Sequence, residues 1–320
     1  VFEQQVLLLC AAMELDTQIA ALCAQAQDAS NRPYPTFALA LALFDDPAWD
    51  IISSDRPLRY WRLVTVNTAG VQPLTVRSLQ ADLRIVNYLK GLNTLDENLH
   101  PYLTPLTTDG NAFPLPPSQQ ASVQATIEAL QRASRHPTAV VQLVGADAAS
   151  QQLVAQAVAA ELGRYPYRLP TPLLPAAATD LDVVGRLCQR EGRLLPVVFY
   201  LDAHGSDGAS GDSAEKSTAL VRFLNQSWGI FIVGTREGLS GVGQPGAVVT
   251  VDKPTTSEQT DIWAAALQEA ETAATLGDRH HHGALLSGQF HLNAVTIQQI
   301  AESVTVEARR AEALSGVLES

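Results

Sequence analysis

Residues 145–152, Gly-Ala-Asp-Ala-Ala-Ser-Gln-Gln, have the surroundings of a phosphate-binding loop without its chemistry. A β-branched run precedes them, and an alanine-rich pattern predicts a helix that begins near Ser150. In a working loop of pattern G-x-x-x-x-G-K-[S/T], backbone N–H groups surround phosphates, the lysine neutralises them and the hydroxyl holds Mg²⁺. In an alignment on Gly145, Ser150 replaces the second glycine, Gln151 the lysine and Gln152 the hydroxyl residue. The order of strand, loop and helix is kept, whereas the functional groups are lost.

The altered loop retains some capacity to attract an anion, because backbone N–H groups and a helix N-terminus favour negative charge. Loss of the lysine removes a charged hydrogen bond to a buried polyphosphate, which costs about 3 kcal/mol. We therefore expect weak binding of ATP with Mg²⁺ at most, and we assign no cofactor. The residues that would surround the phosphates are Gly145, Ala146, Asp147, Ala148, Ala149, Ser150, Gln151 and Gln152.

Two later apolar strands end in polar residues of the same kind of site. Residues 195–201 lead into Asp202 and Ala203, and residues 230–234 lead into Thr235. In phosphate-loop NTPases the Asp orders Mg²⁺, and in many ATPases a Glu beside it activates the attacking water. Here Ala203 replaces that Glu, so we predict no hydrolysis. Asp202 and Thr235 are then vestigial metal and γ-phosphate sensor positions, and Asp202 would hold metal only if Mg-nucleotide bound.

The composition restricts the class of protein. The chain has 320 residues, of which 46% are hydrophobic and 17% charged, and this predicts a folded protein. Its net charge of −12 disfavours nucleic acid and anionic membranes as partners. No run approaches the roughly 18 apolar residues of a membrane span. We expect a soluble cytoplasmic protein and, since the chain starts with Val1, a segment of a longer one.

The hydrophobic pattern divides the chain into four parts. Residues 1–101 are predicted to form helices and one β-hairpin, in a winged-helix-like domain, and the proline-rich residues 102–118 a linker. Residues 119–254 alternate helices with apolar strands, which indicates a parallel sheet covered on both faces. Residues 255–320 have a helical pattern only. The predicted class is therefore mixed α and α/β.

A basic and aromatic cluster lies beside the hairpin, whose strands are predicted at 63–66 and 74–79. Its members are Arg56, Arg59, Tyr60, Trp61 and Arg62. Acidic residues surround it in the sequence, and winged helices also serve as protein-interaction modules. We therefore favour a packing or protein-partner surface, and we keep a winged-helix DNA-binding regulator as an alternative.

The cysteines and a histidine run also invite chemical interpretation. Cys10, Cys23 and Cys188 lie in apolar helical contexts without C-x-x-C spacing, so buried thiols are predicted. Adjacent residues on a helix point about 100° apart, so residues 280–282, His-His-His, cannot form one metal shell. We predict a solvated loop between helices there and no metal site.

The order, spacing and strand character of the motifs resemble those of the AAA+ ATPases. The resemblance assigns a motif-bearing core to 119–254 and a helical lid to 255–320. In AAA+ lids a helix often bears an Arg that contacts the γ-phosphate, and the corresponding positions here are Gln298 and Gln299. The segments 46–49 (Asp-Pro-Ala-Trp) and 56–63 (Arg-Pro-Leu-Arg-Tyr-Trp-Arg-Leu) look like the N-terminal region of large bacterial winged-helix AAA+ proteins.

In that family a degenerate AAA-like module precedes an intact one, and some members are encoded beside phage-tail-like contractile injection systems. The resemblance implies that this chain is the N-terminal domain and degenerate module of a larger ATPase, acting in assembly or regulation. Its expected partners are proteins, either an intact C-terminal AAA module or neighbours in a homo-oligomer. Arg193, Arg222 and Arg236 are candidate contacts to a neighbouring subunit's phosphate. A working ATPase with a non-standard loop stays as the alternative.

Overall fold

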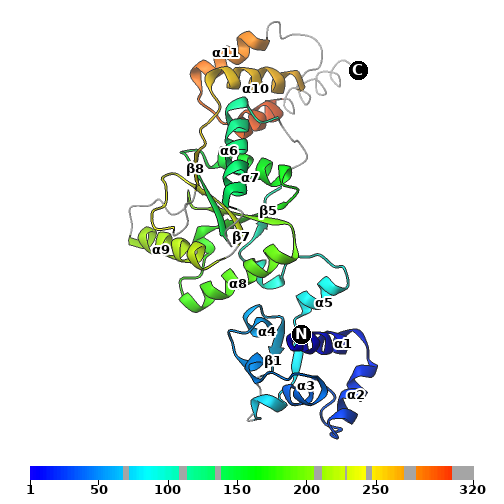
Figure 1. The fold of residues 1–320 in the computed structure, drawn as a ribbon. Coiled ribbons are helices and arrows are strands. Elements are labelled where there is room, and N and C mark those ends of the chain that lie inside the picture. The colour runs from blue at the N-terminus through cyan, green and yellow to red at the C-terminus, as the bar shows by residue number, and fades with distance from the viewer. Residues whose placement is uncertain are drawn as a thin grey trace, which may run out of the picture. The chain divides into compact units, whose positions relative to one another are not determined.

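The computed structural model describes residues 1–67, 72–107, 114–133, 138–204, 211–227, 229–242, 247–269 and 279–304 (Figure 1). Contacts divide the chain into two compact units. The first comprises Val1–Pro101 together with Arg186–Leu195, and the second comprises Tyr102–Gly185 and Pro196–Ser320. Within the ranges given above, no helix is long and apolar enough to cross a membrane.

The N-terminal segment of the first unit is mainly helical, as its apolar periodicity predicts. Its helices are α1 (Phe2–Leu15), α2 (Gln18–Ala26), α3 (Phe37–Leu43), α4 (Pro57–Tyr60) and α5 (Leu83–Leu89), with short 3-10 turns η1 (Trp49–Ile52), η2 (Leu74–Val76) and η3 (Glu97–Leu99). The Thr36 hydroxyl caps α3 and the Asp82 carboxylate caps α5. Buried Val6, Phe37 and Ile51 belong to the core that holds these helices together.

The hairpin of the first unit is shorter than predicted. Strand β1 (Val64–Val66) pairs antiparallel with β2 (Leu79–Ala81), with Thr65 opposite Gln80. The prediction of a strand over 74–79 is wrong for its first part, where Leu74–Val76 form η2. Pro73 precedes this turn and its carbonyl accepts from Val76 N at 3.1 Å, since a proline with fixed φ favours a tight turn.

The second unit contains a six-stranded sheet in the order β3-β5-β6-β7-β4-β8. The strands are β3 (Thr104–Pro105), β4 (Thr138–Val144), β5 (Tyr165–Pro170), β6 (Val197–Asp202), β7 (Gly229–Thr235) and β8 (Ala247–Thr250). All neighbours are parallel except β3, which runs antiparallel to β5. The predicted mixed α/β class with a mostly parallel sheet is confirmed. β3 lies inside the stretch that the sequence predicted as a linker.

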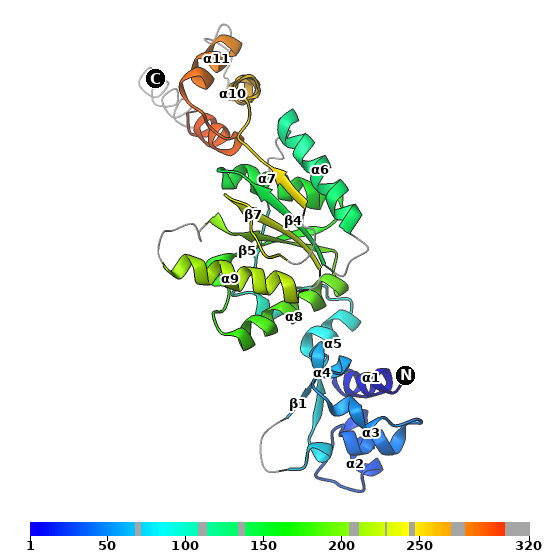
Figure 2. The same cartoon turned by 60° about the vertical axis from the view of Figure 1, so that its left-hand side comes forward.

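Helices cover both faces of this sheet (Figure 2). Helices α6 (Pro117–Ala133) and α7 (Ala148–Glu161) pack on one face, where Val123 and Val154 share a core with the strand residue Val141. Helix α9 (Gly211–Gln226) lies on the other face, together with residues 178–185 of helix α8 (Ala178–Leu194), the part of α8 that belongs to the second unit. There the rings of Phe223 and Phe231 are nearly perpendicular, and the Phe231 ring centroid lies 5.6 Å from that of Phe199. Such two-sided burial explains why β6 and β7 are nearly continuous apolar runs.

A group of C-terminal helices follows the sheet. It comprises α10 (Thr256–Glu269), α11 (Arg279–Gln289) and a helix over residues 294–304. Trp263 and Ile297 are buried in its core, and Leu153 of α7 packs against them. The prediction of a loop at residues 280–282 is wrong, because these three histidines lie in the first turn of α11. The predicted last helix, 295–314, extends outside the described residues beyond 304.

Candidate functional site

The sheet order brings the predicted site residues together. Strands β6, β7 and β4 are parallel neighbours, so their carboxyl ends lie at one edge of the sheet. The register pairs Val144 with Thr235 and Asp202 with Gly234. Because β7 lies between the other two strands, Thr235 lies between the loop that begins at Gly145 and Asp202. Three motifs that are far apart in the sequence thus meet in one place.

The loop after β4 is shorter than the sequence predicts. Helix α7 begins at Ala148, so Ala148, Ala149 and Ser150 already belong to its first turn. Only Gly145, Ala146 and Asp147 connect strand and helix. Asp147 is the N-cap residue, and its Oδ2 accepts from Ser150 N at 2.9 Å. One of the N–H groups that would face a bound anion is therefore already occupied by a side chain of the protein.

Asp147 also joins this loop to the C-terminal helices. Its Oδ1 accepts from Asn293 Nδ2 at 2.8 Å, and Asn293 Oδ1 in turn accepts from Thr296 N at 2.9 Å. Burial alone would raise the pKa of the Asp147 carboxyl, but hydrogen bonds from Ser150 and Asn293, with the charge of Lys253, lower it below its ordinary value. A stabilised carboxylate thus lies at the N-terminus of α7, where it interacts favourably with the helix dipole and repels a phosphate.

Gln151, at the position of the lysine, is fully buried and paired. Its Nε2 donates to the carbonyls of Gly145 at 3.1 Å and Thr235 at 3.0 Å. Its Oε1 lies 2.8 Å from Nε2 of His204, which follows β6. One amide therefore links the ends of all three central strands. The side chain has no free donor with which to approach a ligand.

Two glycines at this edge are required by close packing. A Cβ at Gly145 would overlap the carbonyl of Val251, and a Cβ at Gly234 would overlap the hydroxyl of Tyr200. The Tyr200 hydroxyl is buried without a hydrogen-bond partner among the residues that the structure describes, and burial raises its pKa. Gly145 therefore has a structural role that does not depend on phosphate.

Asp202 forms an ion pair with Arg168 of β5. Arg168 Nη2 and Nε lie 2.6 and 3.1 Å from Asp202 Oδ2, and the Asp202 side chain is 8% exposed. The other oxygen, Oδ1, accepts from His204 N at 3.2 Å. Gln152 Nε2 lies 3.5 Å from Oδ2, too long for a strong hydrogen bond. The Arg168 guanidinium thus compensates the charge of the carboxylate that was predicted as a vestigial metal position.

The remaining predicted positions also have protein partners or lie outside this contact network. Thr235 Oγ1 donates to the carbonyl of Glu237 at 2.7 Å, and Ala203 N donates to the carbonyl of Gly234 at 2.8 Å. Gln298 is half-buried and Gln299 exposed on the helix over 294–304. Ser150 Oγ accepts from Gln119 Nε2 at 2.9 Å.

Sequence reasoning missed Arg168, His204 and Asn293 as members of this network. A charged residue within an apolar strand pattern, such as Arg168, indicates that a partner of opposite charge lies nearby. Its partner could not be read from that signal, since β5 and β6 become neighbours only through the order of the sheet. Asn293 precedes a helix, which predicts a cap, but its contact with Asp147 spans 146 positions.

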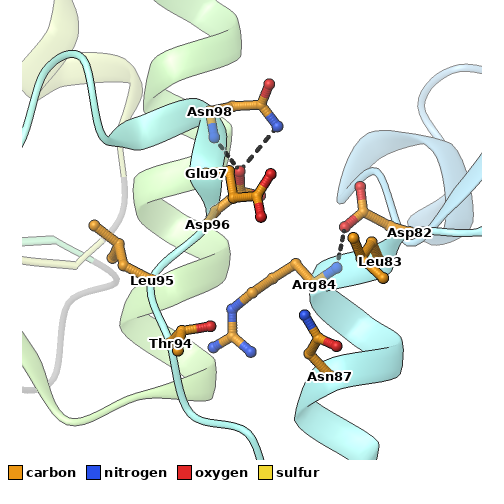
Figure 3. Close-up of a pocket in the computed structure, with 9 residues that line it drawn as sticks. All are labelled: Asp82, Leu83, Arg84, Asn87, Thr94, Leu95, Asp96, Glu97 and Asn98. Carbon is orange, nitrogen blue, oxygen red and sulfur yellow. Dashed lines mark hydrogen bonds between the residues drawn. The ribbon is translucent and has the colours of Figure 1, made fainter.

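A second buried polar cluster lies in the first unit, between α5, the segment around η3 and residues 190–191. Arg84 Nε donates to both carboxylate oxygens of Glu191, at 3.0 and 3.2 Å, and Arg190 pairs with Asp96. Figure 3 shows Arg84 directed between Asn87 and Thr94, beside a cavity of about 110 Å³. Burial raises the pKa of Glu191, although Arg84 and Arg190 oppose this effect. These residues form a structural ion-pair cluster that sequence reasoning did not predict.

The fold and these contacts define an α/β protein with a mostly helical N-terminal unit, in which polar strand ends meet at one sheet edge. Residues 1–103 match the family model of a variant winged helix domain, and residues 255–318 match that of a contractile injection system ATPase helical domain. The comparison with curated proteins gave no match. The two family matches support an ATPase-like protein associated with contractile injection systems. They agree with the predicted N-terminal winged helix and with the predicted injection-system link.

Proposed function

We propose that this chain carries a hydrolysis-incompetent AAA+ module and serves assembly or regulation within a larger ATPase of a contractile injection system. The observation that carries this proposal is the buried Gln151 amide, whose donor and acceptor groups are all used by Gly145, Thr235 and His204. In a working loop the lysine at this position extends away from the protein to contact a bound phosphate, whereas the Gln151 amide bonds only to the protein. The strand order, which gathers Gly145, Thr235 and Asp202 at one edge, supports descent from a nucleotide-binding fold.

The residues present do not fit ATP with Mg²⁺. Asp147 adds negative charge at the helix N-terminus, where phosphates need backbone N–H groups and positive charge. Asp202, the carboxylate predicted at the metal position, is paired with Arg168. A magnesium ion would have to displace that guanidinium and leave it unpaired, which makes binding unfavourable.

The same residues lack the groups that catalyse phosphoryl transfer. Such catalysis depends on positioning the water and stabilising charge on the transferred group. Ala203 offers no base, Gln151 no positive charge, and the Thr235 hydroxyl donates to a backbone carbonyl. The retained fold can still present surfaces to other subunits. Protein partners, namely an intact AAA module of the same protein or neighbouring copies, are therefore the proposed ligands of this module.

Phosphate release from ATP with Mg²⁺ tests the proposal directly. The wild-type chain is expected to release phosphate no faster than Asp202→Ala, because neither offers a metal site or a base. The matched control is an unrelated active ATPase assayed in the same buffer. Turnover above that of Asp202→Ala would overturn the proposal and favour a working ATPase with a non-standard loop.

A further inference from the structure

We infer that a groove beside β1 in the first unit binds an extended, acidic peptide segment of a protein partner. The groove has a volume of about 290 Å³. Its lining residues are Arg59, Arg62, Val64, Thr65, Val66, Leu74 and Arg77. Three arginines thus surround an apolar floor formed by two valines and a leucine. This inference is independent of whether the second unit binds nucleotide.

The three arginines have unused positive charge. Among the described residues, none of Arg59, Arg62 and Arg77 lies within ion-pair distance of a carboxylate. Arg59 Nη1 donates to the carbonyl of Ile52 and Arg77 Nε to that of Gln72, so each keeps further N–H donors. Arg56, by contrast, contacts both Glu3 and Asp50. The groove therefore holds uncompensated positive charge in a chain whose net charge is −12.

The backbone at Arg62 has an unfavourable conformation for an arginine. Its φ is 51°, in the left-handed region that favours glycine or asparagine. The carbonyl of Arg62 accepts from Arg190 Nη1 at 2.9 Å, which helps to fix this conformation. An arginine in an unfavourable backbone conformation gains nothing locally over glycine. A role for its guanidinium in binding explains the residue.

Peptide fits this groove better than nucleic acid does. Within the part of the chain that the structure describes, β1 pairs with β2 alone, so its other edge can exchange main-chain hydrogen bonds with an added strand. Val64, Val66 and Leu74 offer contacts to apolar side chains, which a sugar-phosphate backbone lacks. The net negative charge of the protein would also repel a long polyanion such as nucleic acid, whereas a short acidic peptide contacts only the positively charged groove. In an extended peptide with alternating acidic and apolar residues, the acidic side chains can pair with the arginines and the apolar side chains can contact the two valines and the leucine.

Fluorescence anisotropy with the full chain tests this inference. The probe is a labelled peptide of alternating glutamate and valine, compared with a lysine–valine peptide and a labelled DNA duplex. We expect the glutamate peptide to bind, more weakly at high salt, and the other two probes to bind less well. The double variant Arg62→Glu, Arg77→Glu is expected to weaken binding at least about tenfold, because two attractive contacts become repulsive.

The matched control is Arg222→Glu, which reverses an exposed charge on α9 outside the groove and is expected to leave affinity unchanged. If the double variant does not fold, Arg62→Gln removes one charge without reversing it and is expected to weaken binding about threefold. Equal affinity of wild type and variants for the peptide would overturn the inference. Tighter binding of the duplex than of the peptide would do so as well and would assign the groove to nucleic acid.

Discussion

The neutral amide of Gln151, which the alignment on Gly145 places where a working loop has a lysine, bonds only to the protein. Its three partners come from the loop after β4, the end of β7 and the residue after Ala203. Buried polar groups that are fully paired stabilise a fold, and leaving their partners unpaired is costly. Gln151 thus has a structural role in this fold, and the proposed loss of nucleotide binding would follow from the same contacts.

Gln151→Lys is expected to lower the free energy of unfolding by about 3 kcal/mol or more, because an ammonium group would be buried without a carboxylate partner. It is not expected to restore ATP binding, since Asp147 and the Arg168 pair remain. Chemical denaturation measures the change. Gln152→Lys, at the half-exposed next position, is the control and should change stability by less than about 0.5 kcal/mol. A Gln151→Lys chain as stable as wild type would contradict the buried role.

Arg168→Leu is expected to destabilise the chain by about 1–2 kcal/mol, because it leaves the buried Asp202 carboxylate unpaired. The value is modest because the Arg168 side chain is 39% exposed and solvent screens part of the interaction. The additional substitution Asp202→Asn should restore part of the lost stability, because it removes the unpaired charge. A double-mutant cycle in urea measures the coupling, and a coupling of zero would show that the pair is not energetically linked.

The pKa of Asp147 is lowered from its ordinary value of 3.8, so its charged form stabilises the folded state. This contribution is complete above that value and is lost as pH falls through the lower folded pKa. Asp147→Ala should cost about 1 kcal/mol near pH 7, and the difference from wild type should shrink in strong acid. Asp147→Asn keeps a capping group and separates capping from charge. A loss that is the same at neutral and acid pH would rule out the charge as its source.

Close contacts between strands also determine which residues are allowed at the sheet edge. Gly234 of β7 faces the buried Tyr200 hydroxyl of β6, and Gly145 faces the backbone carbonyl of Val251 after β8. In both cases neighbouring groups are buried and cannot move freely. Loop glycines that suggest ligand binding in a sequence can therefore be explained by packing alone.

Gly234→Ala is expected to lower stability by about 1–3 kcal/mol, because the added methyl would overlap Tyr200. The matched control is Gly288→Ala in α11, where an added methyl meets no atom within 4 Å. That change should be neutral or stabilising by up to about 1 kcal/mol, since alanine favours helix. Thermal unfolding of both variants provides the comparison. Equal effects of the two substitutions would contradict the packing argument.

Apolar runs predicted most of the secondary structure. Strands β4, β6 and β7 carry a strong local signal, because burial on both faces makes them continuously apolar. The prediction of a strand at 74–79 was wrong for its first part, because the β-branched residues there follow a proline that favours a turn. The start of α7 was placed two residues late, because alanines at 148 and 149 gave no sign that Asp147 was the cap.

The partners within the site could not be predicted in the same way. The sequence identified Gly145, Asp202 and Thr235 as a group through their places at strand ends. It could not show that Arg168 pairs with Asp202, which depends on neighbouring strands. Long-range contacts of this kind are set by topology, and no local pattern encodes them.

At the level of the full chain, the two family matches cover the N-terminal and C-terminal segments and leave residues 104–254 unmatched. That unmatched segment contains Gln151, Gln152 and Ala203, three of the positions at which the predicted site departs from a working loop. The proposed division of roles follows from this pattern. On this proposal the terminal segments would make the contacts with protein partners, and the central sheet would serve as a framework whose strand-end side chains bond to one another.

Thermal unfolding of the intact chain with and without millimolar ATP and Mg²⁺ tests this central claim most directly. A ligand at about 100 times its dissociation constant would stabilise the fold by about 2.7 kcal/mol and raise the melting temperature by several degrees. Because Gln151, Asp147 and the Arg168–Asp202 pair close the site, we predict no rise beyond that caused by an equal ionic strength of salt. A rise that requires Mg²⁺ and disappears in Asp202→Ala would contradict the account.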